Sequence, residues 1–473
     1  MSSETAEGRL ARVAARFTAW AERFIPDAFV FALLATVVVV VAALVKTGDV
    51  KVVVQAWGGG FWELLPFTLQ MALVIITGSV VASTRPVYRL IARLAAVPQQ
   101  PRAAVAFVAF FAMASSWFNW GFSLIFSAML AKEVARRVPH ADYRALCASA
   151  FLGLGSIWAQ GLSGSAALQM ATPDALPPSI RAIVAGPGSI VEGGLIPLTD
   201  TIFLWQSLVS VAVELLLVTT LMYFAAPTGA RAKSAEALGV SLGTSPLEAP
   251  APESRGTPGE WWEHRVYLPV FFVALASGSL WLTFTEAAAP LHALNLNTLN
   301  LIFLTVGVAF HGTPARLMRA VKEATPGVWG VILQFPLYAS LAALIVKAQL
   351  NEAIAGFFVS LSTKETYPAV VAIYSAALGV FVPSGGSKWV IEAPYVMQAA
   401  HDLKVHLGWC VAAYDLGEAL ANLIQPFWML PVLSLFGLKA RDVMGYTALV
   451  FLVLAPVVLV LVTVLGLTLP YPS

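Results

Sequence analysis

The sequence predicts an all-α polytopic membrane protein built from two inverted repeats, each with a re-entrant hairpin and a discontinuous helix. Three observations predict this fold class. The 473 residues are 59% hydrophobic and only 11% charged, whereas a soluble protein carries about 25% charged residues. Many apolar stretches reach the length of about 20 residues that crosses a bilayer as a helix. Polar and helix-breaking residues interrupt several of these stretches near the middle.

Composition and missing motifs exclude other classes of protein. A net charge of +2 is too small to indicate a nucleic-acid partner. Cys147 and Cys410 both lie in apolar runs, which gives neither a disulfide framework nor zinc spacing. The chain has no G-x-x-x-x-G-K-[ST] loop, no G-x-S-x-G elbow and no H-x-x-x-H pair. We therefore expect a protein that is not an enzyme and that binds no cofactor or metal apart from a coupling ion.

The first 26 residues predict an amphipathic helix on the membrane surface. Its apolar residues are three or four positions apart, with four arginines mostly between them. The apolar positions are Leu10, Val13, Phe17, Trp20 and Phe24. Such a helix suits an anionic inner leaflet, although a polar lead-in to the first span is the alternative. No apolar h-region with a cleavage site precedes residue 27, so we expect no secretory signal.

Nine stretches predict full membrane spans. They are 27–46, 64–84, 146–172, 202–224, 265–284, 293–311, 328–346, 408–437 and 443–467. Two further stretches, 103–131 and 368–399, are too long for one span and are interrupted at 115–121 (SSWFNWG) and 383–388 (PSGGSK). Pro, Gly, Ser and Asn break helices or compete for their hydrogen bonds. Because such a break at membrane depth requires surrounding protein or a water-filled cavity, we expect two re-entrant hairpins.

The distribution of Lys and Arg predicts the orientation. With the N-terminus in the cytoplasm, the inside segments hold 21 of the 28 basic residues, the outside segments hold six, and Lys388 lies in a hairpin. Cytoplasmic loops carry an excess of basic residues, so this bias predicts an inner-membrane protein with a cytoplasmic N-terminus and a periplasmic C-terminus. The segment 225–264 contains scattered Pro, Gly and Ser and predicts a flexible cytoplasmic linker.

Two parts of the chain, 27–224 and 291–467, align as repeats on either side of the linker and a connecting span at 265–284. The matching positions are 46–48 with 310–312, 69–70 with 333–334, and the hairpins at 103 and 368. Five spans precede the second repeat, and this odd number predicts that it is inverted. Inverted repeats with broken helices are typical of secondary transporters.

Polar residues gather at the hairpin tips and in the spans 146–172 and 408–437, which we expect to be broken near Gly161–Gly164 and Gln425-Pro426. Half-helix N-termini attract anions, and free carbonyls and hydroxyls suit a small cation. The candidate substrate-binding residues are Ser116, Asn119, Gly121, Gln160, Ser384, Gly385, Gly386, Ser387, Lys388 and Asn422. The candidates for ion or proton coupling are Ser115, Ser156, Ser163, Glu418 and Gln425. Helix capping is an equal alternative for the residues of the first tip.

Lys388 is the most informative single residue. It follows the second tip by two residues and cannot easily reach water from the membrane midplane. It therefore needs an anion, which is Glu392, Glu418 or a substrate carboxylate; a permanent ion pair is the structural alternative to substrate binding. Glu418 lies at span depth and is a candidate carrier of a coupling proton. Glu214 stands alone among Val and Leu, and we expect it to be a scaffold contact.

Several motifs make the chain resemble the bacterial short-chain fatty acid transporter family. They are FIPD at 24–27, WGGGFW at 57–62, NWGF at 119–122, AKEVARRVP at 131–139, VPSGG at 382–386 and QPFW at 425–428. The resemblance covers nearly the whole chain and implies uptake of small monocarboxylates such as acetoacetate, butyrate or acetate across the inner membrane. That family is similar in layout to the ion transporter superfamily of dicarboxylate and aminobenzoyl-glutamate carriers. This likeness implies a dimer with a scaffold and a moving transport domain.

The residues and the resemblance together predict a secondary active carrier coupled to H⁺ or Na⁺, with an elevator mechanism. Its partners are then a small carboxylate, the lipid bilayer and a second copy of the chain. A passive channel for small organic anions is the alternative, because hairpins that enter from both sides also occur in channels. Saturable flux that responds to an imposed ion gradient distinguishes the carrier from the channel.

Overall fold

Every secondary-structure element described in the computed structural model is a helix. The structure describes residues 28–172, 175, 195–242, 256–287, 290–381, 385–425 and 427–471. The predicted amphipathic helix at 1–26 lies outside these ranges. The α-helices of the first half are α2 (Ala28–Thr47), α3 (Val50–Gly60), α4 (Leu65–Ala82), α5 (Arg85–Leu94), α6 (Pro101–Phe118), α7 (Trp120–Arg137), α8 (Tyr143–Phe151), α9 (Ser165–Ala171) and α11 (Trp205–Ala225).

The second half begins with two helices that have no counterpart in the first, α12 (Pro258–Glu263) and α13 (Tyr267–Glu286). The remaining α-helices are α14 (Leu296–His311), α15 (Pro314–Ala324), α16 (Trp329–Lys347), α17 (Leu350–Leu361), α18 (Tyr367–Phe381), α19 (Gly385–Asp402), α20 (Leu407–Asn422), α21 (Leu430–Phe436) and α22 (Ala440–Gly466). Short 3-10 turns connect several of these helices, including η1 (Ile157–Gln160) and η10 (Phe427–Met429).

Six helical stretches of the described residues are long and apolar enough to cross a membrane. They are 50–82, 101–118, 205–225, 267–286, 329–347 and 440–466. Three shorter apolar helices, at 33–47, 296–311 and 367–380, add to them. Seven of the nine predicted spans coincide with continuous helices, and the spans 146–172 and 408–437 are interrupted as expected. The count of nine crossings stays a prediction.

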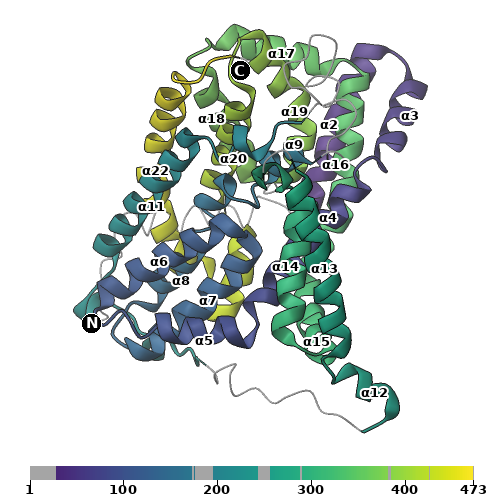
Figure 1. The fold of residues 1–473 in the computed structure, drawn as a ribbon. Helices are drawn as coiled ribbons and strands as arrows, with labels where there is room; N and C mark the ends of the chain where they lie inside the picture. Colours follow the sequence, from purple (N-terminus) through teal and green to yellow (C-terminus); the bar gives the residue numbers. More distant parts are fainter. Residues whose placement is uncertain are drawn as a thin grey trace.

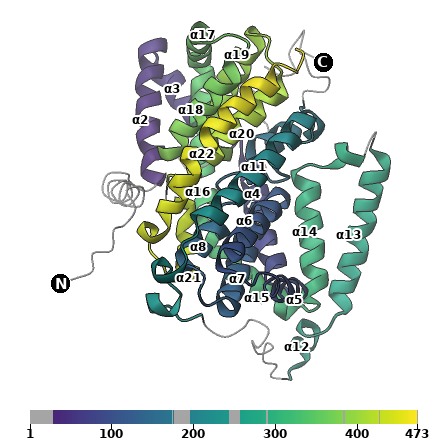
Figure 2. The same cartoon turned by 90° about the vertical axis from the view of Figure 1, so that its left-hand side faces the viewer.

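Equivalent helices of the two halves start at a nearly constant spacing. Helices α3 and α15 begin at residues 50 and 314, α4 and α16 at 65 and 329, and α8 and α20 at 143 and 407, which is 264 residues apart in each case. Of these pairs, α3 and α15 lie at opposite ends of the molecule: α3 is near α17 at one end, whereas α15 is near α5 at the other (Figures 1 and 2).

The first predicted break consists of a single residue. Helix α6 ends at Phe118 and α7 begins at Trp120, and Asn119 between them has extended backbone with φ −162° and ψ 123°. The Asn119 side chain accepts a hydrogen bond from the Phe122 amide at 2.8 Å and caps α7. The second break covers residues 382–384, which lie outside the described ranges, and α19 begins at Gly385. Lys388 therefore lies in the first turn of a helix.

The segment 226–242 makes more contacts than a flexible linker would. The buried Asp142 accepts a hydrogen bond from the Lys233 amide at 3.0 Å, and the Tyr143 amide donates to the Lys233 carbonyl at 2.9 Å. Arg136 donates to the Leu242 carbonyl at 2.6 Å. These contacts fasten the first part of the predicted linker to α7 and α8, because a buried carboxylate needs donors and the passing backbone provides them. Residues 243–255 lie outside the described ranges.

Candidate functional site

Close backbone packing positions both broken regions. A β-carbon at Gly153 would lie 2.3 Å from the carbonyl oxygen of Ala112, and one at Gly417 would lie 2.2 Å from that of Ala372. Glycine is therefore needed where the chain passes α6 in the first half and α18 in the second. The two glycines are 264 residues apart, the same spacing that relates the helices. Each broken helical region is thus packed against a hairpin helix in the same way.

A small cavity lies where α4, α16, α19 and α20 meet the two breaks. Its volume is about 40 Å³, space for a few water molecules. Its walls combine indole rings, backbone and polar side chains. They include Trp120, Trp158, Gly385, Gly386, Glu418 and Asn422. The cavity therefore collects residues from both halves of the chain, and four of these six come from the second half.

Lys388 and Glu418 form a buried ion pair beside this cavity. The Lys388 Nζ lies 2.5 Å from Glu418 Oε2 and donates a hydrogen bond to the Ser375 carbonyl at 2.9 Å. The ammonium also lies 5.5 Å from the centroid of the Tyr414 ring. Lys388 is 2% exposed and Glu418 is fully buried. Of the anions that the sequence offers to Lys388, the structure pairs it with Glu418 on α20.

The carboxylate of Glu418 is only partly satisfied by this pair. The Lys388 ammonium contacts Oε2, whereas Oε1 has no hydrogen-bond partner among the described residues. Glycines surround the carboxylate closely: a β-carbon at Gly379 would lie 2.7 Å from Oε2, and one at Gly385 would lie 2.9 Å from Glu418 Cγ. Glu418 therefore has acceptor capacity left for a proton or a donor.

The two glycines at the start of α19 bring backbone to the cavity. The carbonyl of Gly386 accepts a hydrogen bond from Gln169 Nε2 at 2.8 Å, and a β-carbon at this residue would lie 3.3 Å from Ser165 Cβ. The first amides of a helix have no intrahelical acceptor and carry positive partial charge. Together with Lys388 in the same turn, they make this end of α19 electropositive. Ser384 lies outside the described residues, as does the side chain of Ser387.

Asp415 joins the two halves of the chain. Its carboxylate accepts hydrogen bonds from the Ala166 amide at 3.1 and 3.2 Å and from the Ala167 amide at 3.2 Å. Asp415 on α20 thereby caps α9, the second part of the broken helix in the first half. Asp415, Trp158 and Gln169 did not stand out in the sequence as site residues. Asp415 and Gln169 are polar residues within predicted spans, which is the signal that could have found them.

Neutral side chains surround the first tip, and most of them are satisfied locally. Ser163 Oγ accepts from the Trp120 amide at 2.9 Å, and Ser115 Oγ donates to Ser123 Oγ at 3.0 Å. Ser116 is buried, and its hydroxyl has no hydrogen-bond partner among the described residues. Gly121 lies close to the Asn119 side chain. None of these residues contacts the Lys388–Glu418 pair in the described part of the chain.

The other candidate residues divide between two places. Asn422 lines the cavity, donates to the Leu154 carbonyl at 3.0 Å and accepts from Gln425 Nε2 at 2.8 Å. Ser156 donates to the Leu152 carbonyl at 2.7 Å. Gln160 points away from the cavity to Glu214 on α11, with Nε2 2.5 Å from the carboxylate. The structure thus gathers Gly385, Gly386, Lys388, Glu418, Asn422 and Gln425, and leaves Ser115, Ser116, Ser156, Ser163 and Gln160 elsewhere.

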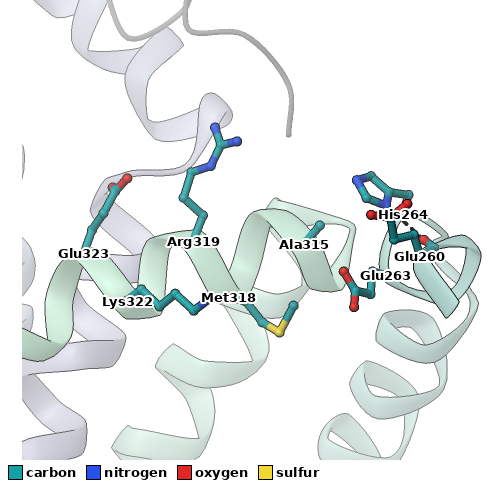
Figure 3. Close-up of a pocket in the computed structure, with 8 residues that line it drawn as sticks. All are labelled: Glu260, Glu263, His264, Ala315, Met318, Arg319, Lys322 and Glu323. Carbon is teal, nitrogen blue, oxygen red and sulfur yellow. Dashed lines mark hydrogen bonds between the residues drawn. The ribbon is translucent and has the colours of Figure 1, made fainter. Parts of the chain in front are cut away.

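A larger hollow of about 410 Å³ lies between α12 and α15, away from this site (Figure 3). Three carboxylates line it, together with two cationic side chains and one imidazole. They are Glu260, Glu263 and Glu323, with Arg319, Lys322 and His264. Because charges of both signs face this hollow, it offers no concentrated positive field for an anion. The small central cavity is the better candidate for a carboxylate site.

Comparison with known proteins agrees with the residues and the fold. The family model described as "Short chain fatty acid transporter" matches residues 9–466. A protein of Escherichia coli strain K12, named as a presumed short-chain fatty acid transporter, is 37% identical over 94% of this chain and 97% of its own length. A Haemophilus influenzae protein with the same name is 33% identical over 93% of this chain and 97% of its own length.

Two solved structures share the fold at low sequence identity. The YdaH transporter of Alcanivorax borkumensis superimposes with a TM-score of 0.59 at 16% identity, over 93% of this chain and 98% of that chain. MtrF of Neisseria gonorrhoeae, from a class of antimetabolite efflux pumps, gives a TM-score of 0.61 at 13% identity, over 96% and 97%. The arrangement of helices described above is therefore similar to that of two known membrane transport proteins.

Proposed function

The chain belongs to the short-chain fatty acid transporter family, and from this premise we propose that it is a secondary active carrier for short-chain carboxylates of the acetoacetate, butyrate and acetate class. It is a multi-pass membrane transporter and not an enzyme. The observation that carries the proposal is the buried Lys388–Glu418 pair at the wall of a cavity built by both halves.

In this proposal the substrate carboxylate and Glu418 compete for one cation. When Glu418 takes up a proton, it loses its charge and its hold on Lys388. The substrate carboxylate then binds the Lys388 ammonium and the first amides of α19, since a buried ammonium needs an anion. Departure of the substrate restores the ion pair and expels the proton. At this site, one carboxylate and one proton therefore move together, and the site has the same net charge before and after both have bound.

The exchange favours H⁺ over Na⁺ as the coupling ion. A hard cation such as Na⁺ needs several oxygen ligands directed at one point. The hydroxyls of Ser115, Ser156 and Ser163 are separately bonded to neighbours in the described structure and do not converge with Glu418. A single carboxyl group, by contrast, is sufficient to carry a proton. Na⁺ remains the alternative that the transport assay tests.

The helix positions support the rest of the sequence-based prediction as part of this proposal. The constant spacing of equivalent helices and the opposite placement of α3 and α15 support two inverted repeats, each with a re-entrant hairpin. We further propose an inner-membrane homodimer with a cytoplasmic N-terminus and a periplasmic C-terminus, in which the hairpins and broken helices move as an elevator against α2–α4 and α14–α16.

Transport by the purified protein in proteoliposomes tests the function. We expect saturable uptake of labelled butyrate that an inward proton gradient accelerates and that a Na⁺ gradient leaves unchanged. Counterflow of labelled against unlabelled butyrate should proceed without any ion gradient, as in a carrier. Flux that does not saturate and shows no counterflow would indicate a passive anion channel instead.

Cysteine labelling tests the inverted topology. The native Cys147 and Cys410 are buried, so single cysteines introduced at exposed positions report on their own side of the membrane. His140 and Asp402 are both exposed and follow the two hairpins at equivalent places. An impermeant thiol reagent applied to whole cells should label Asp402→Cys and spare His140→Cys. Labelling of both variants, or of His140→Cys alone, would contradict the inversion.

A further inference from the structure

Another buried carboxyl group lies on α11, which packs against the turn η1. Glu214, in the middle of α11, is fully buried. Its Oε1 atom accepts hydrogen bonds from Gln160 Nε2 at 2.5 Å and from Ser210 Oγ at 3.0 Å. Its Oε2 atom has no partner among the described residues, and the same holds for the Oε1 atom of Gln160. Two acceptors on adjacent side chains thus lack a donor.

Among the described residues, no cation compensates Glu214. Helices α6 and α22 and the turn η1 pack against α11. Their charged or titratable groups are Arg102 on α6 and Arg441, Asp442 and Tyr446 on α22, with Tyr223 on α11 itself. Arg102, Arg441 and Asp442 lie at the ends of their helices, and Tyr446 donates to Asp142 at 3.2 Å. None of them forms a hydrogen bond or ion pair with Glu214. An ionised carboxylate in this position would be buried without a counter-charge, which is very costly.

A proton on Glu214 resolves both deficiencies at once. It removes the uncompensated charge, and it turns Oε2 into a donor for the Gln160 oxygen, which has no donor of its own among the described residues. A carboxylic acid and a primary amide can exchange two hydrogen bonds, with the amide N–H donating to the carbonyl oxygen and the acid O–H donating to the amide oxygen. The first of these bonds is present between Gln160 and Glu214.

From this geometry we propose that Glu214 is a second proton-binding site of the carrier, protonated in the conformation described. The inference rests on the proposed carrier function and extends it: Glu418 is paired with Lys388, whereas Glu214 has no cation among the described residues and can take up and release a second proton during transport.

The turn η1 connects this site to the cavity. Trp158 and Gln160 are two residues apart in η1: the Trp158 ring lines the cavity, and Gln160 bonds to Glu214. The same turn packs against α20, which carries Glu418. Loss of the proton from Glu214 would leave its carboxylate facing the Gln160 oxygen and would weaken this contact. The position of Trp158 at the cavity then depends on whether Glu214 is protonated.

Glu214→Gln tests the proposal, because glutamine imitates the protonated acid without being able to release a proton. With the variant in proteoliposomes that contain a pH-sensitive dye, we expect butyrate counterflow to be retained. The number of protons that accompany each butyrate should fall by about one. Glu286→Gln is the matched control, since Glu286 is exposed at the end of α13, and it should keep the wild-type ratio. An unchanged ratio in Glu214→Gln would overturn the proposal.

Infrared spectroscopy gives a readout that does not depend on transport. The purified wild-type protein at neutral pH should show the carbonyl stretch of a protonated carboxylic acid, and Glu214→Gln should lose it while Glu286→Gln keeps it. If neither protein differs from the wild type, Glu214 is not protonated and the inference fails. If the band is lost but wild-type protein shows no counterflow, the carrier function fails while the protonated state of Glu214 stands.

Discussion

The two hairpins share a backbone arrangement but differ in charge. Gly153 packs on α6 and Gly417 packs on α18 with almost the same separation. At the first tip, the neutral side chains of Asn119 and Ser163 accept hydrogen bonds from backbone amides. At the second, Lys388 and Glu418 form an ion pair that is excluded from water. The two halves therefore share one packing arrangement and differ in the charged side chains that lie beside it.

The contrast also separates two kinds of polar residue within a membrane. A neutral residue that caps a helix end is satisfied by its own backbone and needs no ligand. A buried ion pair instead carries a large desolvation cost and responds strongly to removal of one partner. Substitutions in the second hairpin should accordingly have larger effects than equivalent substitutions in the first.

The largest effect is expected from Lys388→Met. It leaves Glu418 buried without its cation, so the free energy of unfolding should fall by about 3–5 kcal/mol. The double variant Lys388→Met/Glu418→Gln should regain most of this stability, because removing both charges is often neutral. Thermal unfolding in detergent measures the stability of both variants. If Lys388→Met is as stable as the wild type, Lys388 does not compensate the charge of Glu418.

The same double variant tests substrate binding. If Lys388 holds the substrate carboxylate, its loss removes a charge-assisted hydrogen bond of about 1.5–3 kcal/mol. At 1.4 kcal/mol per tenfold change, butyrate affinity should fall about ten- to a hundredfold. Binding measured by calorimetry on the folded double variant decides the matter, and wild-type affinity would leave Lys388 with only its structural role.

Substitutions of the two packing glycines, Gly153 and Gly417, should lower the free energy of unfolding by equal amounts. Gly153→Ala and Gly417→Ala both push a β-carbon into a carbonyl oxygen, and overpacking of this kind costs about 1–3 kcal/mol. Gly58→Ala is the control, because its β-carbon meets nothing within 4 Å and alanine in a helix gains about 0.5–1 kcal/mol. A loss at only one of the two glycines would break the equivalence of the hairpins.

A smaller effect is expected at the first tip. Asn119→Ala removes the cap of α7 and should lower stability by about 1 kcal/mol. Asn119→Asp keeps an acceptor at the cap, so it should retain both stability and butyrate affinity, since the Asn119 side chain is not among the described residues that line the cavity. A folded Asn119→Asp variant with weakened butyrate binding would instead show that the first tip contacts the carboxylate.

The smallest effect concerns the residues that cap α8 and α20. Asp142 caps the first and His406 caps the second, where its Nδ1 accepts from the Trp409 amide at 3.1 Å. Burial lowers the pKa of the His406 imidazole. Because the unfolded chain then binds a proton more readily, stability should be full above the ordinary histidine pKa of about 6.5 and should fall as the pH drops below it. His406→Asn should remove this dependence in thermal unfolding measured across that range.

Much of this architecture could be predicted from sequence because membrane helices and their breaks have strong signals. Apolar length located the helices, and Asn119 and the glycines at 385–386 marked the two breaks. Lys388 was conspicuous as a charge within an apolar stretch. Its choice of Glu418 over Glu392 could not be read from the chain, since both carboxyls were within plausible reach and only the approach of α19 to α20 decides between them.

Contacts between a side chain and a backbone group could not be predicted from the sequence. The Ser375 carbonyl holds Lys388, and the amides of Ala166 and Ala167 hold Asp415, yet a carbonyl or an amide exists at nearly every residue and gives no local signal. For the same reason the sequence of 226–242 resembles that of a flexible linker: Lys233 and Leu242 bond to the side chains of Asp142 and Arg136 through a backbone amide and a backbone carbonyl.

The cap that Asp415 provides for α9 has a consequence for synthesis of the protein. Asp415 and Ala166 are separated by 249 residues, which a ribosome adds in roughly 12–50 s at about 5–20 residues per second. For that time the first amides of α9 lack the acceptor that they have in the finished protein. The broken helix of the first half therefore lacks this cap until the second half has been synthesised and inserted.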